Sequence, residues 1–299
     1  MIDLMNRYKV ISFYKYVNIN DPSALAEEHL KWCLANGVKG KVYLANEGIN
    51  GSVFGNEEIT EKYKIHLKQY PAFSDIWFKE TLTETIAFTK MHVRVKSEIV
   101  NSGLMNTKLE NTAPKLTPEQ LLKFYEDKKD FVIVDARNWY ESKIGKFKNA
   151  ITPQITHFRE WPEVVDSLKE YKNKTIVTYC TGGIRCEKAS AYMREQGFKD
   201  VYQIDGGILN FIQKFPDTFW EGGMFVFDDR RVFEPNSNEE LKYTSNCHFC
   251  NKPTSYHINC HNLDCDKIIV CCHDCKIEKE YCCSDECRSS TNKRKVFHG

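Results

Sequence analysis

The chain has 299 residues, 13 cysteines and a formal net charge of +1. This length allows two or three domains, and the near-zero charge excludes a global basic signature for nucleic acid. No run of about 18 apolar residues is present, which excludes a transmembrane helix and a membrane partner. The stretch Met1–Lys9 lacks the apolar region of a signal peptide, so we expect a cytoplasmic protein whose cysteines serve metal binding and catalysis rather than disulfides.

Residues 1–110 predict a small α+β domain. A β-branched and aromatic strand over 9–17 is followed by an amphipathic helix over 21–34, for which Asp21 is the N-cap and Pro22 the first residue. Further strands and one helix follow at 39–44, 51–55, 56–69 (the helix), 76–82 and 89–96. The order of the first six elements, βαββαβ, is the ferredoxin-like, or acylphosphatase-like, pattern.

Two segments of this domain allow both a structural and an RNA-binding interpretation. Gly48–Gly51 fits a hairpin turn between paired strands, which we favour, although its N–H groups could also contact a phosphate. The run Lys90–Lys96 alternates basic and apolar residues, so a strand would place its basic side chains on one face. That face is either a solvated sheet surface or a surface for an RNA backbone.

Residues 97–114 are polar and aperiodic and predict a linker, and residues 115–222 predict an α/β domain. Thr117 begins a helix with a capping box completed by Gln120. The short apolar run Phe131–Val134 is typical of a buried parallel strand. Strands at 174–179 and 199–204 alternate with helical segments, which indicates a doubly wound parallel sheet.

The centre of this domain is a strand that ends at Cys180, a turn of Thr181, Gly182 and Gly183, and a helix that begins near Arg185. Backbone N–H groups of the turn, the positive end of the helix and the Arg185 charge all favour a thiolate. The pKa of Cys180 should therefore lie below the free value of about 8.5, and we identify Cys180 as the nucleophile. A merely structural cysteine would not require two glycines and an arginine.

Four residues separate Cys180 from Arg185, one fewer than in cysteine phosphatases, and this shorter loop suits a sulfur atom better than a phosphate. Together with Ile184 and Cys186, the sequence C-T-G-G-I-R-C-E-K-A over 180–189 resembles the active loop of rhodanese domains. It is most similar to that of the tRNA uridine-34 hydroxylases, and the run Trp220–Phe233 resembles the same family.

This resemblance implies an activity and its partners. The family makes 5-hydroxyuridine in the tRNA anticodon with molecular oxygen as co-substrate, which favours RNA binding by the first domain. By analogy with rhodaneses, we expect Cys180 to carry a persulfide. No flavin or haem motif is present in the sequence. How oxygen is activated and which reductant supplies the electrons are therefore open.

Three further features near the loop have defined alternatives. Asp135 and Arg137 match a rhodanese fingerprint, and we favour a structural ion pair that supports the site. Cys186 is either a resolving thiol or a packed helix residue. The run Trp220–Phe233 either covers the active-site mouth or forms a packed strand.

Residues 223–299 predict a cysteine-rich module. Four cysteine pairs follow one another: Cys247 and Cys250, Cys260 and Cys265, Cys272 and Cys275, and Cys283 and Cys287. Eight thiols match two structural Zn²⁺ sites, with an iron–sulfur cluster as the competing interpretation. Spacing leaves open whether the pairs combine sequentially or interleaved, and whether the adjacent Cys271 and Cys282 replace a ligand. Reserve ligands are His248, His257, His261 and His273.

Three functions remain as hypotheses. We favour an oxygen-dependent tRNA uridine-34 hydroxylase with Cys180 and Arg185 in the site. The alternative is a generic sulfurtransferase that moves sulfane sulfur through a Cys180 persulfide. A silent rhodanese fold that only binds RNA or zinc is disfavoured, because both Cys180 and Arg185 are present.

Overall fold

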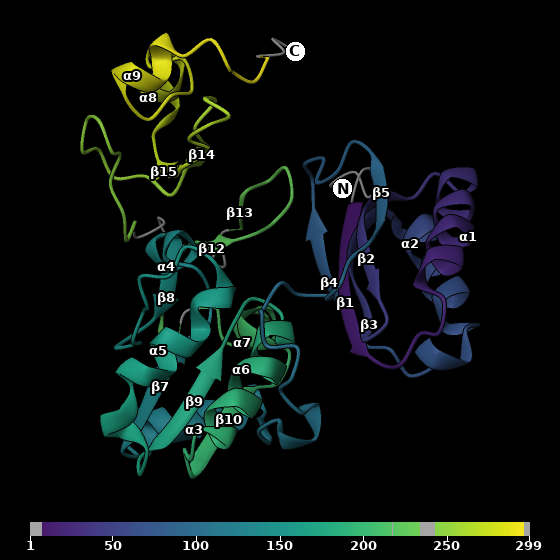
Figure 1. Ribbon diagram of the computed structural model, residues 1–299, viewed down its shortest axis with the longest axis vertical. Helices are drawn as coiled ribbons and strands as arrows, with labels where there is room; N and C mark the ends of the chain where they lie inside the picture. The colour runs from purple at the N-terminus through teal and green to yellow at the C-terminus, as the bar shows by residue number, and fades with distance from the viewer. Residues whose placement is uncertain (1–7, 217, 234–242, 296–299) are drawn as a thin grey trace, which may run out of the picture.

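The computed structural model describes residues 8–216, 218–233 and 243–295. Most of the stretch Met1–Lys9, on which we based the absence of a signal peptide, lies outside these residues. Figure 1 shows an N-terminal α+β domain beside a central α/β domain, with the cysteine-rich module (yellow) above the central domain at the top of the view. Within the described ranges, no helix is both long and apolar enough to cross a membrane.

The N-terminal domain is a five-stranded sheet with two helices on one face. Its elements are β1 (Tyr8–Tyr16), α1 (Pro22–Ala35), β2 (Lys39–Ala45), β3 (Gly48–Asn56), α2 (Glu57–Lys68), β4 (Phe78–Thr83) and β5 (Met91–Val95). The strand order is β4-β1-β3-β2-β5. The predicted ferredoxin-like pattern is confirmed, and β5 extends it as an edge strand parallel to β2.

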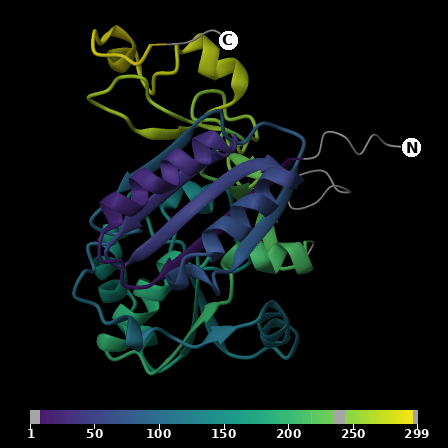
Figure 2. The ribbon, with the colours of Figure 1, turned by 90° about the vertical axis from the view of Figure 1, so that its right-hand side faces the viewer.

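The helices of this domain begin where the sequence predicts. Asp21 accepts hydrogen bonds from the N–H groups of Ser23 and Ala24, and Asn56 accepts one from Ile59. Figure 2 shows both helices over one face of the sheet, where they cover Ile11 and Phe13. The other face of the sheet points toward the central domain (Figure 1).

The placement of the hairpin turn at Gly48–Gly51 is wrong. Strand β3 already begins at Gly48, and the turn between β2 and β3 consists of Asn46 and Glu47. Gly48 has a φ of +146°, and a Cβ there would lie 2.1 Å from the carbonyl oxygen of Lys15. The glycine is therefore needed because strand β1 approaches closely.

The central domain is a parallel sheet between two helical layers, as predicted. Its strands are β6 (Lys115–Leu116), β7 (Phe131–Asp135), β9 (Thr175–Tyr179) and β10 (Asp200–Ile204), in the order β6-β10-β9-β7. Its helices are α3 (Pro118–Glu126), α4 (Trp139–Ile144), α5 (Trp161–Ser167), α6 (Ile184–Glu195) and α7 (Gly207–Lys214). Ile176 of β9 belongs to one core cluster and Val177 to another, so both faces of the sheet are buried.

The predicted linker at 97–114 is irregular but packed. Its only regular element is a 3-10 turn over Leu109–Asn111. Leu104 and Ala113 are buried in the core of the central domain, and Glu98 accepts a hydrogen bond from Lys188 of α6. The segment therefore fixes the N-terminal domain against the central one.

The C-terminal part has little regular structure. Strand β11 (Trp220–Gly222) pairs with β8 (Gly145–Phe147) of the central domain, and β12 (Met224–Phe225) pairs with β13 (Val232–Phe233). The module beyond residue 243 contains the hairpin of β14 (His257–Asn259) and β15 (Ile268–Val270), followed by α8 (His273–Glu278) and α9 (Asp285–Ser289). Cysteines make up much of its small core.

Candidate active site and metal centres

Cys180 lies directly after β9, at the carboxyl end of the parallel sheet, where α/β proteins bind ligands. The N–H of Gly183 donates a hydrogen bond to the Cys180 Sγ atom over 3.2 Å. Gly183 is the N-cap of α6 and has a φ of +100°, a conformation that favours glycine. A Cβ at this position would also lie 2.9 Å from the Tyr14 hydroxyl. The glycine therefore permits both the turn and a close neighbour.

The surroundings of Cys180 favour the thiolate although the side chain is buried. Burial alone would raise the pKa, but the Cys186 thiol, the Arg185 charge and the N–H groups of Cys186 and Arg185 lower it to about 6. Cys33, in the N-terminal core, provides an internal comparison, because burial without such partners raises its pKa to about 12. The loop, and not burial, therefore favours the thiolate form of Cys180 at neutral pH.

Arg185 is held by a partner that the sequence did not indicate. Its Nη1 and Nη2 atoms donate to the two carboxylate oxygens of Glu141 over 2.7 and 3.1 Å. Glu141 follows β7 on helix α4 and is fully buried. This bidentate pair orients the guanidinium beside the loop. In the sequence, the only hint of this pair is that Glu141 follows one strand and Arg185 follows another, so that both lie near the same edge of the sheet.

Asp135 and Arg137 form a fully buried ion pair, with 2.7 Å between Arg137 Nη2 and Asp135 Oδ2. Arg137 also donates to the carbonyl of Gly145, and the Ser142 hydroxyl donates to Asp135. These bonds tie the turn after β7 to strand β8. The pair lies at the end of β7, just before helix α4, which carries Glu141, the partner of Arg185.

Cys186 lies in the first turn of α6, is fully buried and belongs to the same core cluster as Cys180. Burial raises its pKa well above the ordinary value, and the neighbouring Cys180 raises it further. Cys186 is therefore the thiol of this pair, and its proximity favours the thiolate of Cys180. Packing and proximity to Cys180 are both present, so the two predicted roles do not exclude each other.

The N-terminal domain covers the active loop, which the sequence did not predict. The Tyr14 hydroxyl donates to Glu187 over 2.9 Å, and the Tyr16 hydroxyl donates to the carbonyl of Ile184 over 3.3 Å. Lys188 of α6 reaches back to Glu47 and Glu98 over 2.8 and 2.7 Å. Cys180 itself is 1% exposed.

The run Trp220–Phe233 packs as a strand, one of its two predicted roles, and brings one aromatic ring to Arg185. Trp220 pairs as part of β11 with strand β8, while the Phe227 ring lies 5.4 Å from the Arg185 guanidinium carbon. Phe227 is 51% exposed. The segment thus packs as a strand and also places an aromatic ring at the edge of the site.

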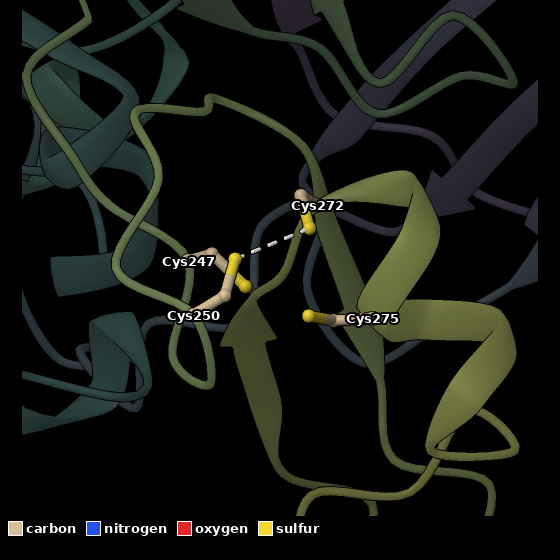
Figure 3. A group of neighbouring side chains, drawn as sticks. All are labelled: Cys247, Cys250, Cys272 and Cys275. Carbon is tan, nitrogen blue, oxygen red and sulfur yellow. Dashed lines mark hydrogen bonds between the residues drawn. The ribbon is translucent and has the colours of Figure 1, made fainter.

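The eight paired cysteines form two groups. Cys247 and Cys250 face Cys272 and Cys275 (Figure 3), and Cys260 and Cys265 face Cys283 and Cys287. Within each group all sulfur atoms lie within 4.8 Å of one another. The pairs therefore interleave along the chain. Cys271 and Cys282 belong to neither group, nor does any of the four histidines.

The sulfur separations match a single tetrahedral ion. Thiolates at about 2.3 Å from one Zn²⁺ ion are about 3.8 Å apart in a tetrahedron. The Sγ atoms of Cys250 and Cys272 are 3.7 Å apart, and Cys283 lies 3.7 Å from Cys265 and 3.6 Å from Cys287. A multi-iron cluster would hold its four thiolates further apart, because its core of iron and sulfide atoms lies between them. Each group could hold one metal ion.

A parallel sheet with an activated cysteine in the turn after its central strand defines a rhodanese-type domain. The family model described as Rhodanese-like domain matches residues 117–214. The models described as UPF0176 acylphosphatase like domain and Rhodanase C-terminal match residues 8–99 and 221–288. These matches agree with the three parts seen in the fold.

Curated relatives match almost the whole chain. A tRNA uridine(34) hydroxylase of Bacillus licheniformis is 40% identical and covers 95% of this chain and 89% of its own length. Those of Cytophaga hutchinsonii and Staphylococcus carnosus are also 40% identical, each over 97% of this chain. The chain therefore belongs to the tRNA uridine(34) hydroxylase family, as the loop sequence predicted.

Proposed function

We propose that this protein hydroxylates uridine 34 of tRNA to 5-hydroxyuridine in an oxygen-dependent reaction that requires Cys180. The observation that carries the proposal is the 40% identity to tRNA uridine(34) hydroxylases over nearly the full chain. An active loop that combines the Cys180 thiolate with Arg185 supports it.

In this proposal, the chain's own residues have distinct tasks. Cys180 is the nucleophile and carries a persulfide, and the N–H of Gly183 supports the charge on its sulfur. Arg185 is the cation of the loop, and Glu141 holds it in position. Asp135 and Arg137 support the loops from below without contacting substrate. Molecular oxygen is the co-substrate, and a separate reductant supplies electrons.

The two cysteine groups are proposed to be structural Zn²⁺ sites. A site closed by four thiolates leaves no position for substrate, so its contribution is to folding. The module has few apolar residues and little regular structure, and metal ligation would supply the cross-links that its small core lacks.

We further propose three functional units with the boundaries 1–110, 115–222 and 223–299, and tRNA binding by the first. Lys90, His92, Arg94 and Lys96 are all exposed. Lys41 and Tyr43 of β2 lie directly opposite His92 and Arg94 of β5, so they extend the same face. Clustered cations on one face suit contacts to a phosphate backbone. A tRNA substrate and reduced cysteines also support a cytoplasmic location.

Nucleoside mass spectrometry of bulk tRNA tests the main proposal. Cells that lack this protein are complemented with the wild type, with Cys180→Ala or with Cys33→Ala as a matched control. We expect 5-hydroxyuridine or its derivatives to return with the wild type and with Cys33→Ala only. If Cys180→Ala also restores 5-hydroxyuridine, the Cys180 loop does not take part in the reaction. If not even the wild type restores it, the hydroxylase proposal is refuted.

A generic sulfurtransferase is the second candidate, because the rhodanese-like match over 117–214 covers the complete Cys180 loop. This function predicts turnover of thiosulfate with cyanide as acceptor and no need for the N-terminal domain. If thiosulfate turnover is robust while tRNA is unchanged, sulfur transfer becomes the leading function.

A further inference from the structure

A lysine from the N-terminal domain is buried at the active loop and is not used by the proposed reaction. Lys79 of β4 is 6% exposed, and its Nζ atom lies 4.7 Å from the Trp77 ring centroid and 4.8 Å from that of Tyr14. Among the residues that the structure describes, no carboxylate pairs with it. The rings therefore surround a largely buried ammonium, and removing an ammonium from water is costly.

The two rings beside Lys79 lie against both turns that surround Cys180. A Cβ at Gly206 would lie 2.5 Å from the Trp77 ring, and one at Gly183 would lie 2.9 Å from the Tyr14 hydroxyl. The turn at Gly206 leads to Ile208, whose N–H donates to the carbonyl of Cys180 over 3.0 Å. Trp77 is nevertheless 47% exposed. One ring at the loop is therefore open to a ligand.

The charges around Lys79 keep it a cation at neutral pH. Burial, the largest effect, and Lys115 lower its pKa, whereas Cys180, Asp205 and Glu187 raise it, and together they give a pKa of about 8. Tyr14 and Trp77 contribute the negative faces of their rings. Lys79 therefore provides a hydrogen-bond donor next to the nucleophile.

We propose that Lys79, Tyr14 and Trp77 form a binding site for the uracil base on which Cys180 acts. This site, here called the Lys79 site, rests on the proposed function. The base stacks on Trp77, and Lys79 donates to a uracil carbonyl. Enzymes that modify a base hold the extruded base by aromatic stacking and by hydrogen bonds to its edge. Both bases have a carbonyl at position 2, but at position 4 cytosine has an amino donor where uracil has a carbonyl, so an ammonium that donates to O4 selects uracil.

The sheet connects the Lys79 site to the exposed basic face. Lys79 lies opposite Ser12, Ser12 opposite Ser52, Ser52 opposite Lys41, and Lys41 opposite His92. Residues paired in this way share one face of a sheet. Five strands span about 19 Å. The RNA backbone on one side of the bound base can therefore follow this face to the exposed cations.

RNA binding measured by fluorescence anisotropy tests the Lys79 site. The probes are anticodon stem-loops that carry uridine, cytidine or an abasic residue at position 34. We expect wild type to bind the uridine RNA about tenfold more tightly than the abasic RNA, a typical effect of one stacked base. Trp77→Ala and Lys79→Met should remove this difference and leave the affinity for the abasic RNA unchanged. Lys79→Met should also remove the preference of the wild type for the uridine RNA over the cytidine RNA.

Matched controls are Leu82→Ala, an exposed apolar residue on the same strand, and Lys199→Met, an exposed lysine at the opposite end of the parallel sheet. Both should retain the wild-type preference. If Lys79→Met shifts only the titration of Cys180 and retains the preference for uridine, Lys79 is a partner of the thiolate and the proposal is wrong. If wild type hydroxylates tRNA without distinguishing the three RNAs, the Lys79 site is refuted while the proposed function stands. A retained preference without hydroxylation refutes the function alone.

Discussion

The ionisation of Cys180 provides a direct test of the active loop through Cys186→Ala. This change removes the neighbouring thiol that lowers the pKa of Cys180, while Arg185 and the backbone N–H groups remain. A hydrogen bond to a charged acceptor contributes about 1.5 kcal/mol, which corresponds to about one pH unit. The pKa of Cys180 should therefore rise from about 6 to about 7.

At about pH 6.5, the thiolate fraction should fall from about three quarters to about one quarter. The assay is the rate of iodoacetamide labelling at Cys180 across pH, followed by peptide mass spectrometry. The difference in ultraviolet thiolate absorbance from Cys180→Ala provides a second measurement that does not depend on reagent access. Cys33→Ala is the control and should leave both curves unchanged. An unchanged titration in Cys186→Ala would show that the thiol contributes nothing, and a wild-type pKa near the free value would refute the electrostatic account of the loop.

Asp135→Asn removes one partner of the buried Asp135–Arg137 pair and should lower the free energy of unfolding by about 3–5 kcal/mol, measured by denaturant titration. The control Asp130→Asn changes an exposed pair with Lys174 and should leave the unfolding transition unchanged. Cys275→Ser and Cys287→Ser should each reduce the bound zinc from two ions per chain to one, measured by elemental analysis. The controls Cys271→Ser and Cys282→Ser should retain both ions. Loss of zinc in either control would show that the ligand sets are wrong. Because the folded pKa of Cys180 is lowered, its ionisation stabilises the fold above the unfolded pKa of about 8.5, and this stabilisation disappears as pH falls through about 6. Wild type should therefore lose stability relative to Cys180→Ala over this range, and parallel curves would contradict the lowered pKa.

The local parts of this protein could be predicted from its sequence. The helix that begins after Asp21, the apolar strand at Phe131 and the strand–turn–helix around Cys180 each depend on residues close together in the chain. Cys180 itself was found because the glycines, the helix terminus and Arg185 that activate it are its sequence neighbours. The eight candidate metal ligands were found for the same reason, since each pair is formed by local spacing.

The partners of these local units depended on the tertiary structure. Glu141 pairs with Arg185 across 44 residues, and Tyr14 reaches Glu187 across 173 residues. No local pattern indicates such contacts, because they arise from the order of strands in a sheet and from the docking of one domain on another. The turn at Asn46 and Glu47 was misplaced for a related reason, since the glycine at position 48 serves a neighbouring strand.

The same distinction applies to the metal centres and to the surface of the first domain. The sequence by itself predicted four cysteine pairs with metal-ligand spacing and a strand at Lys90–Lys96 with its cations on one face. Only the tertiary structure decided that the pairs interleave and that this face continues through Lys41 and Ser12 to Lys79 beside Cys180. Short-range spacing fixes which side chains share an element, whereas the meeting of distant elements depends on packing that buries the apolar surface of both.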